Sequence, residues 1–102
     1  MKRIIVRYKV KPERVQENEA YIKEVFAELN QTGPAGLRYA SFKGSDGLTF
    51  FHIVSLEAEN DDSPLSRSEA FKAFTANIQE RCDEPPMPMN LEEVGSYRFF
   101  DG

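Results

Sequence analysis

The chain has 102 residues, of which 40% are hydrophobic and 29% charged, and its formal net charge at pH 7 is −4. This composition excludes a wholly disordered chain and, at this length, favours one globular domain spanning residues 1–102. The negative charge argues against nucleic acid or an anionic membrane as the main partner, because phosphate binding needs clustered positive charge. Cys82 is the only cysteine and no apolar run reaches transmembrane length, so we expect a cytoplasmic protein.

The first predicted element is a strand over residues 2–10, whose side chains alternate between an apolar face and a basic stripe of Arg3, Arg7 and Lys9. We expect this stripe to pair with acidic residues at the sheet edge or across a dimer, although it could also bind a ligand carboxylate or phosphate. Apolar residues at helical spacing then predict a helix from Pro12 to about Gln31.

Two strands and a tight turn come next. Residues 37–43 and 48–56 read as strands, and the Gly-Ser-Asp-Gly turn at 44–47 predicts that they form an antiparallel hairpin. The second of these strands carries the only histidine, His52, on the same face as Phe50 and Val54.

The remaining elements are a second helix and a last strand. Ser66 and Glu69 have the spacing of a capping box, and Phe71, Phe74, Ile78 and Cys82 follow on one helical face. The acidic segment 57–64 is expected to be a solvated loop. Three prolines predict an irregular segment over 83–90, and residues 91–100 are expected to form the final strand, with Glu92 and Glu93 on opposite faces.

This order of elements predicts an α+β, ferredoxin-like βαββαβ fold, in which a four-stranded antiparallel sheet carries two helices on one face. The first and third strands should be central. Apolar residues such as Ile5, Phe51 and Ile53 lie on the other face, where the helices cannot cover them. Burying each would contribute roughly 1.5–3 kcal/mol, so we expect a homodimer through this open sheet face rather than a monomer with scattered exposed residues.

Several segments resemble the antibiotic biosynthesis monooxygenase family. They are the first strand running into "YKVKPE", the "GLRY" entry to the second strand, the hairpin, and "SEAFKAF" at 68–74. The resemblance covers nearly the whole chain and implies a dimeric α+β barrel with a substrate cleft between helices and sheet in each protomer. Some members of the family oxidise polyphenolic substrates with O2 and no cofactor, and others degrade haem.

The sequence departs from the patterns of active members at three places. Leu56 stands where many have a tryptophan at the end of the third strand, and Phe74 stands where many have a histidine on the second helix. The first strand lacks the asparagine that haem-degrading members use. A cofactor is therefore not expected.

His52 is the candidate catalytic residue. The resemblance implies that its strand face lines the cleft, where an imidazole could act as a general base on a small aromatic ligand. Tyr8, Tyr39 and Phe74 are the candidate substrate-binding residues. The alternatives are a hydrogen-bonded core histidine and tyrosines that only pack, and Cys82 is expected to be a buried, inert thiol.

These features predict a small homodimer that resembles the cofactor-independent monooxygenases acting on aromatic or polyketide-like molecules. The alternative is a non-catalytic ligand-binding or regulatory dimer on the same fold. RNA binding, which this order of elements also permits, lacks its aromatic strand motif here. The sequence shows no spacing typical of metal ligands.

Overall fold

The computed structural model describes residues 2–57 and 63–99 of the chain. Most of the acidic segment expected to be a loop therefore lies outside the described residues. The elements are β1 (Lys2–Val10), η1 (Pro12–Arg14), α1 (Val15–Thr32), β2 (Leu37–Lys43), β3 (Thr49–Leu56), η2 (Pro64–Arg67), α2 (Glu69–Ala76), α3 (Ile78–Arg81) and β4 (Cys82–Leu91).

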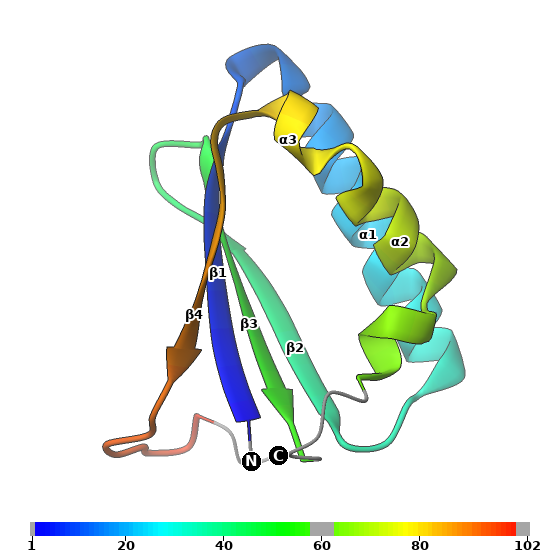
Figure 1. The fold of residues 1–102 in the computed structure, drawn as a ribbon, viewed down its shortest axis with the longest axis vertical. Helices are drawn as coiled ribbons and strands as arrows, with labels where there is room; N and C mark the ends of the chain where they lie inside the picture. The colour runs from blue at the N-terminus through cyan, green and yellow to red at the C-terminus, as the bar shows by residue number, and fades with distance from the viewer. Residues whose placement is uncertain (1, 58–62, 100–102) are drawn as a thin grey trace.

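The four strands form one antiparallel sheet in the order β2-β3-β1-β4. The predicted ferredoxin-like α+β fold is thus confirmed, with β1 and β3 at the centre as expected. Both long helices lie on the same face of the sheet, and the other face is left without a covering layer (Figure 1). This arrangement puts every second residue of β1, β2 and β3 between the sheet and α1.

The long helix α1 begins and ends where the sequence provides a signal. Pro12 opens the short 3-10 helix η1 that leads into it, because a residue without an N–H is tolerated in a first turn. At the other end Gly33 takes φ 56° and its N–H donates to the Leu29 carbonyl at 2.8 Å. A residue with a Cβ is strained in this left-handed conformation, so glycine ends the helix here.

The predicted hairpin connects β2 and β3. The Asp46 carboxylate accepts hydrogen bonds from the backbone N–H groups of Leu48 and Thr49 and from the Thr49 hydroxyl, at 2.9, 2.9 and 2.6 Å. These three bonds hold the pKa of Asp46 down at about 2. The turn sets the register in which His52 lies opposite Ser41 on β2 and Val6 on β1.

The last strand is not where the sequence predicted it. The proline-rich segment expected to be irregular is β4, and no strand follows Leu91 among the described residues up to Phe99. The prolines are tolerated because β4 is an edge strand that pairs only with β1, and the register shifts between Arg7 and Lys9, opposite Pro85 and Pro86. Glu92 and Glu93 therefore do not occupy opposite faces of a strand.

The second helix is shorter than expected and has a different cap. Ser68, not Ser66, is the N-cap of α2, and its Oγ accepts from the Phe71 N–H at 3.0 Å. The helix stops at Asn77, and a single turn, α3, follows. Cys82, predicted on the helix, is instead the buried first residue of β4.

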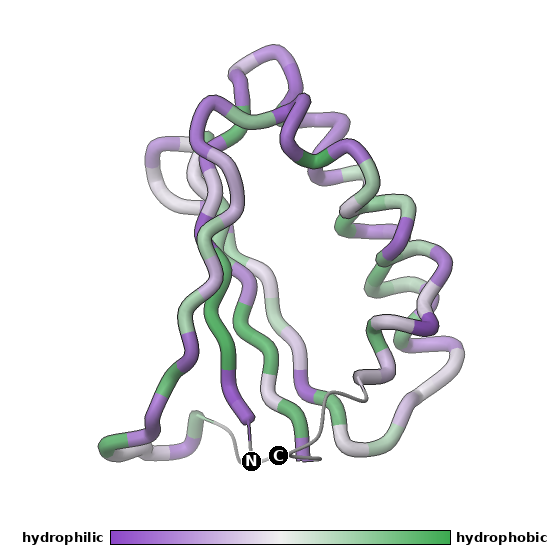
Figure 2. Tube along the Cα trace, viewed as in Figure 1, coloured by the Kyte–Doolittle hydropathy of each residue, from purple (hydrophilic) through white to green (hydrophobic). Residues whose placement is uncertain are grey.

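The main core lies between sheet and helices and is centred on Tyr8, Val10, Val25, Phe50 and Phe74. In Figure 2 apolar residues also run along the strands themselves. The strand register places a second apolar group on the uncovered face, which comprises Ile5, Phe42, Phe51, Ile53, Met87, Met89 and Leu91. Within the described part of the chain, no helix is long and apolar enough to cross a membrane.

Candidate functional site

His52 lies in the middle of β3 on the face that the helices cover, as the family resemblance implied. Its side chain is buried, and only 4% of the residue is exposed. Burial disfavours the charged imidazolium and lowers the pKa of His52 from 6.5 to about 4. The imidazole is therefore neutral at pH 7.

Three hydroxyl groups surround the imidazole. Tyr8 on β1 lies with its hydroxyl 2.8 Å from Nε2, and Tyr39 on β2 lies with its hydroxyl 2.7 Å from Nδ1. Ser41, two residues along β2, has its Oγ 3.4 Å from Nε2. Burial raises the pKa of both tyrosines above the ordinary value of 10.0, so both hydroxyls keep their protons at neutral pH.

The polar cluster continues from Tyr8 to two residues that the sequence analysis missed. Asn18 on α1 donates from Nδ2 to the Tyr8 hydroxyl at 2.9 Å, and Arg81 at the end of α3 donates from Nε to Asn18 Oδ1 at 3.3 Å. Both side chains are fully buried. A signal was present, because each interrupts an apolar helical stripe: Asn18 lies three residues after Val15, and Arg81 lies three after Ile78.

Phe74 on α2 is packed against this cluster. Its ring centroid lies 5.4 Å from that of His52 and 6.3 Å from that of Tyr8. Phe74 and Tyr8 are each at most 3% exposed. The structure therefore brings all four predicted site residues together, and Tyr39 also lines a cavity.

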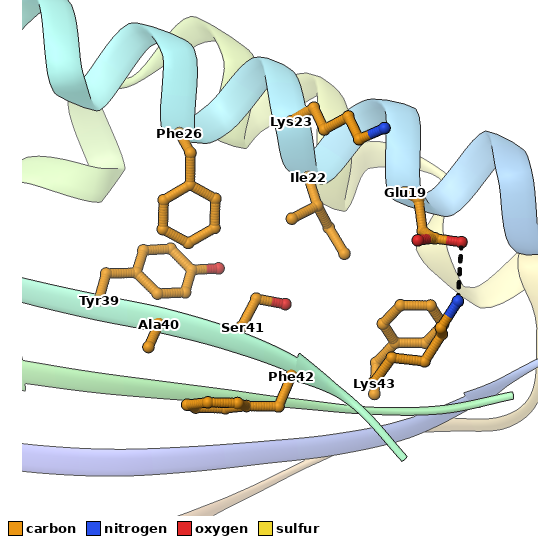
Figure 3. Close-up of a pocket in the computed structure, with 10 residues that line it drawn as sticks. Glu19, Ile22, Lys23, Phe26, Tyr39, Ala40, Ser41, Phe42 and Lys43 are labelled. Carbon is orange, nitrogen blue, oxygen red and sulfur yellow. Dashed lines mark hydrogen bonds and ion pairs between the residues drawn. The ribbon is translucent and has the colours of Figure 1, made fainter. Parts of the chain in front are cut away.

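That cavity is a cleft of about 430 Å³ between α1 and β2, at the β2 edge of the sheet. In Figure 3 the Phe26 ring on α1 lies above the Tyr39 ring, and the Ser41 side chain points towards α1. A salt bridge between Lys43 and Glu19, 3.4 Å long, closes one side. The lining residues are Glu19, Ile22, Lys23, Phe26, Tyr39, Ala40, Ser41, Phe42, Lys43 and Phe50.

The aromatic pair of Tyr39 and Phe26 also borders a second, smaller cavity. The two ring centroids are 5.0 Å apart, and on their other side lies a space of about 240 Å³ near Leu29, Pro34 and Leu37. Phe26 and Tyr39 line both spaces. The cleft can thus accommodate a ligand of one or a few aromatic rings.

The other residues considered from the sequence lie apart from the cleft. Arg3 pairs with Glu93 at 2.6 Å and Arg7 with Glu84 at 3.1 Å, beside β4, so two residues of the basic stripe pair at the sheet edge as expected. Tyr97 is 82% exposed.

Two further features concern reactivity. Burial raises the pKa of the Cys82 thiol, which fits the expectation of an unreactive cysteine. In the part of the chain that the structure describes, no three His, Cys, Asp or Glu side chains cluster to hold a metal ion.

Fold and cleft together define a two-layer α+β protein with an aromatic-lined cleft between its long helix and an edge strand. No sequence model of a known protein family matches the chain, and no curated protein matches it in sequence. Solved structures do match.

A crystal structure of an antibiotic biosynthesis monooxygenase has a TM-score of 0.74 at 18% identity, over 93% of this chain and 100% of that chain. A conserved protein from Methanosarcina mazei has a TM-score of 0.73 at 20% identity, over 90% and 91% of the two chains. A protein from Mycobacterium tuberculosis has a TM-score of 0.75 at 15% identity, over 93% and 96%. The chain therefore has the fold of the antibiotic biosynthesis monooxygenases, and the resemblance noted in the sequence is confirmed at the level of the fold.

Proposed function

We propose that the chain binds a small phenolic aromatic molecule in the cleft between α1 and β2 and oxidises it with O2, without a metal or flavin. One observation carries this proposal. Two hydroxyls that line the cleft, those of Tyr39 and Ser41, both contact the buried neutral imidazole of His52. A polar pair backed by a proton acceptor in an otherwise apolar cleft is the arrangement expected of a site that orients and deprotonates a phenol.

The proton path follows from these contacts. A ligand hydroxyl beside Ser41 passes its proton to Oγ as the serine proton moves to His52 Nε2, 3.4 Å away, where it takes the place of the hydrogen bond from Tyr8. Tyr39 orients the ligand through its own hydroxyl. The electron-rich ligand anion then reacts with O2 at a ring C–H ortho or para to its oxygen, and the hydroperoxide formed there takes the proton back from His52 and loses water, which leaves a second carbonyl on the ring. The ligand supplies the four electrons that reduce the two oxygen atoms of O2.

The same proposal includes a cytoplasmic homodimer. On the uncovered sheet face the strand register brings together Phe42, Phe51, Ile53, Ile5 and Met89, and the ion-paired Arg7 lies among them opposite Phe51. Phe42 is 49% and Met89 65% exposed in the single chain, which is unfavourable for side chains of this size. A second copy related by two-fold symmetry would bury this face of both chains at once.

Oxygen consumption with a panel of small quinols and naphthols tests the activity. Steady turnover is expected, and His52→Ala and Ser41→Ala should each lower kcat at least about tenfold, because general-base catalysis contributes a factor of this size or more. Tyr97→Phe is the matched control, since it removes an exposed hydroxyl far from the cleft. Turnover that persists unchanged in His52→Ala contradicts the role given to the imidazole.

A second function, non-catalytic binding of the same ligand class, is favoured by the state of His52. Its pKa of about 4 makes the imidazole a weak base, and hydroxyls already occupy both of its nitrogens. Leu56 and Phe74 also stand where the resemblance implies catalytic residues. Saturable naphthol binding with no O2 consumption across the panel would establish this function in place of the first.

Analytical ultracentrifugation tests the dimer separately. We expect the wild-type chain to sediment as a dimer and Ile53→Glu to sediment as a monomer, because the substitution places a charge between Ile5 and Ala40 on the apolar face. Thr75→Glu, which adds the same charge on the exposed side of α2, should remain dimeric. A wild-type monomer at high concentration would remove the dimer from the proposal.

A further inference from the structure

A continuous series of hydrogen bonds connects the buried end of α3 to the cleft. It runs from Arg81 through Asn18, Tyr8 and His52 to Tyr39, and it draws on α3, α1, β1, β3 and β2 in turn. Each bond in the series joins side-chain atoms 2.7 to 3.3 Å apart. The donor and the acceptor of every bond follow from the chemistry of the first residue.

Arg81 determines which group donates and which accepts in the first hydrogen bond of the series. A guanidinium group only donates hydrogen bonds, so the Asn18 atom that faces its Nε must be the carbonyl oxygen. The guanidinium cannot easily turn away, because a second nitrogen donates to the Phe74 backbone carbonyl. Its central carbon also lies 4.6 Å from the Tyr21 ring centroid.

The donor and acceptor of each following bond are then determined in turn. With its oxygen turned to Arg81, Asn18 presents its amide nitrogen to Tyr8, and the Tyr8 oxygen must accept. The Tyr8 proton is left to donate to His52 Nε2. His52 is neutral, since burial lowers its pKa to about 4, and a neutral imidazole with an accepting Nε2 carries its proton on Nδ1.

The last bond decides what the cleft offers to a ligand. The Nδ1–H group of His52 donates to the Tyr39 oxygen, so the Tyr39 hydroxyl proton donates to no other group among residues 2–57 and 63–99. Tyr39 lines the cleft. A ligand there meets a hydroxyl donor with its proton available.

We infer that Arg81 and Asn18 are positioning residues that hold His52 in the Nδ1–H tautomer and direct the Tyr39 hydroxyl proton into the cleft, so that the site selects ligands with a hydrogen-bond acceptor, such as a carbonyl or phenolate oxygen. The ligand preference rests on the proposed function, because it requires the cleft to be a ligand site. The tautomer does not depend on it.

The tautomer can be read directly, because the chain has one histidine. In a two-dimensional ¹H–¹⁵N spectrum of the imidazole at pH 7, the wild-type protein should show a protonated Nδ1 and a pyridine-like Nε2. Tyr21→Phe is the matched control. It removes a tyrosine hydroxyl beside Arg81 that is outside the series, and the tautomer should not change.

Asn18→Asp is the decisive variant, because it has nearly the same shape and reverses the series. A carboxylate paired with Arg81 can only accept, so Tyr8 must donate to it and must in turn accept from His52 Nε2–H. Nδ1 then accepts the Tyr39 proton. The spectrum of Asn18→Asp should therefore change to a protonated Nε2. Tyr8→Phe is a second, independent variant: it removes the hydroxyl that donates to Nε2, so the imidazole should no longer be held in the Nδ1–H tautomer.

The ligand preference is tested with two bicyclic probes of similar size, 1-indanone, which only accepts, and indole, which only donates. Wild-type protein should bind indanone about three- to tenfold more tightly than indole in NMR titrations, which is the value of one hydrogen bond. Asn18→Asp should reverse this order. The amide signals of Ser41 and Phe26 report whether a probe occupies the cleft.

The outcomes separate the inference from the proposed function. A wild-type Nε2–H tautomer, or an Asn18→Asp spectrum that remains Nδ1–H, overturns the positioning role whatever the probes do. Equal binding of the two probes, with the expected tautomers, overturns the ligand preference. If neither probe shifts the cleft signals while the tautomers change as expected, the cleft is not a ligand site and the proposed function fails, but the positioning role stands.

Discussion

The lowered pKa of His52 predicts a specific loss of stability in mild acid. The unfolded chain takes up a proton on this histidine as the pH falls below the ordinary value of 6.5, whereas the folded chain does not until about pH 4. Between these two values the unfolded state binds more protons, so the free energy of unfolding falls as the pH falls. The contribution is fully present above pH 6.5 and is lost by pH 4. The gap between the two pKa values corresponds to about 3 kcal/mol in all.

Urea denaturation at fixed protein concentration measures this loss, and His52→Gln provides the comparison. Glutamine keeps hydrogen-bonding groups near Tyr8 and Tyr39 but does not titrate. Between pH 7.5 and pH 5 the wild-type protein should lose about 2 kcal/mol more than the variant, calculated from the two pKa values of His52. Carboxylates titrate in both proteins and cancel in the difference.

Parallel pH profiles would refute the reasoning. If wild type and His52→Gln lose the same free energy between pH 7.5 and pH 5, the histidine is protonated in the folded state near its ordinary pKa. It could then not have the buried, neutral environment that the hydroxyls of Tyr8 and Tyr39 provide. At pH 5 the imidazolium would carry protons on both nitrogens, so a single tautomer could exist only at higher pH.

Four further substitutions have expected outcomes. Phe50→Ala should lower the free energy of unfolding in urea by about 3–5 kcal/mol, because the ring is buried and stacked on Tyr8 at 5.6 Å. Gly33→Ala should cost about 1–2 kcal/mol from its positive φ alone, since no atom lies within 4 Å of the added Cβ, and the melting temperature should fall accordingly. Asp46→Asn should destabilise the fold at pH 7, and the difference from wild type should vanish as the pH falls from 3.8 to about 2. Thr49→Val, which removes one bond to Asp46, should raise the pKa of that carboxyl in an NMR titration.

The fold could be predicted from periodicity except where proline concealed a strand. The alternating residues of β1 and β3 and the Gly-Ser-Asp-Gly turn gave the central strands and their pairing. Residues 83–90 were predicted to be irregular because proline has no N–H to donate to a neighbouring strand. An edge strand needs donors on one side only, and a register shift absorbs Pro85 and Pro86, so the local rule was overruled by the position of the strand in the sheet.

The centre of the candidate site was predictable for a related reason. His52 and Tyr8 were expected on the helix-facing side of paired strands, and the register places them side by side, with Tyr39 on the next strand. Alternation and pairing are enough to predict such neighbours. The sequence could not show that Tyr8 and Phe74 are buried while Tyr39 lines the cleft, because this depends on how α1 lies above β2.

The role of Arg81 was not predicted because the last strand was expected too late in the chain. With the last strand expected at 91–100, residues up to Cys82 continued a helix, and an arginine near a helix end is usually solvated. In the structure Cys82 pairs with Val10, and the Lys11 N–H donates to the Arg81 carbonyl at 2.8 Å. The start of the edge strand thus fixes the backbone of Arg81 against the end of β1, with its side chain directed inward to Asn18. The tautomer inferred for His52 therefore depends on the register of a proline-containing strand that contributes no residue lining the cleft.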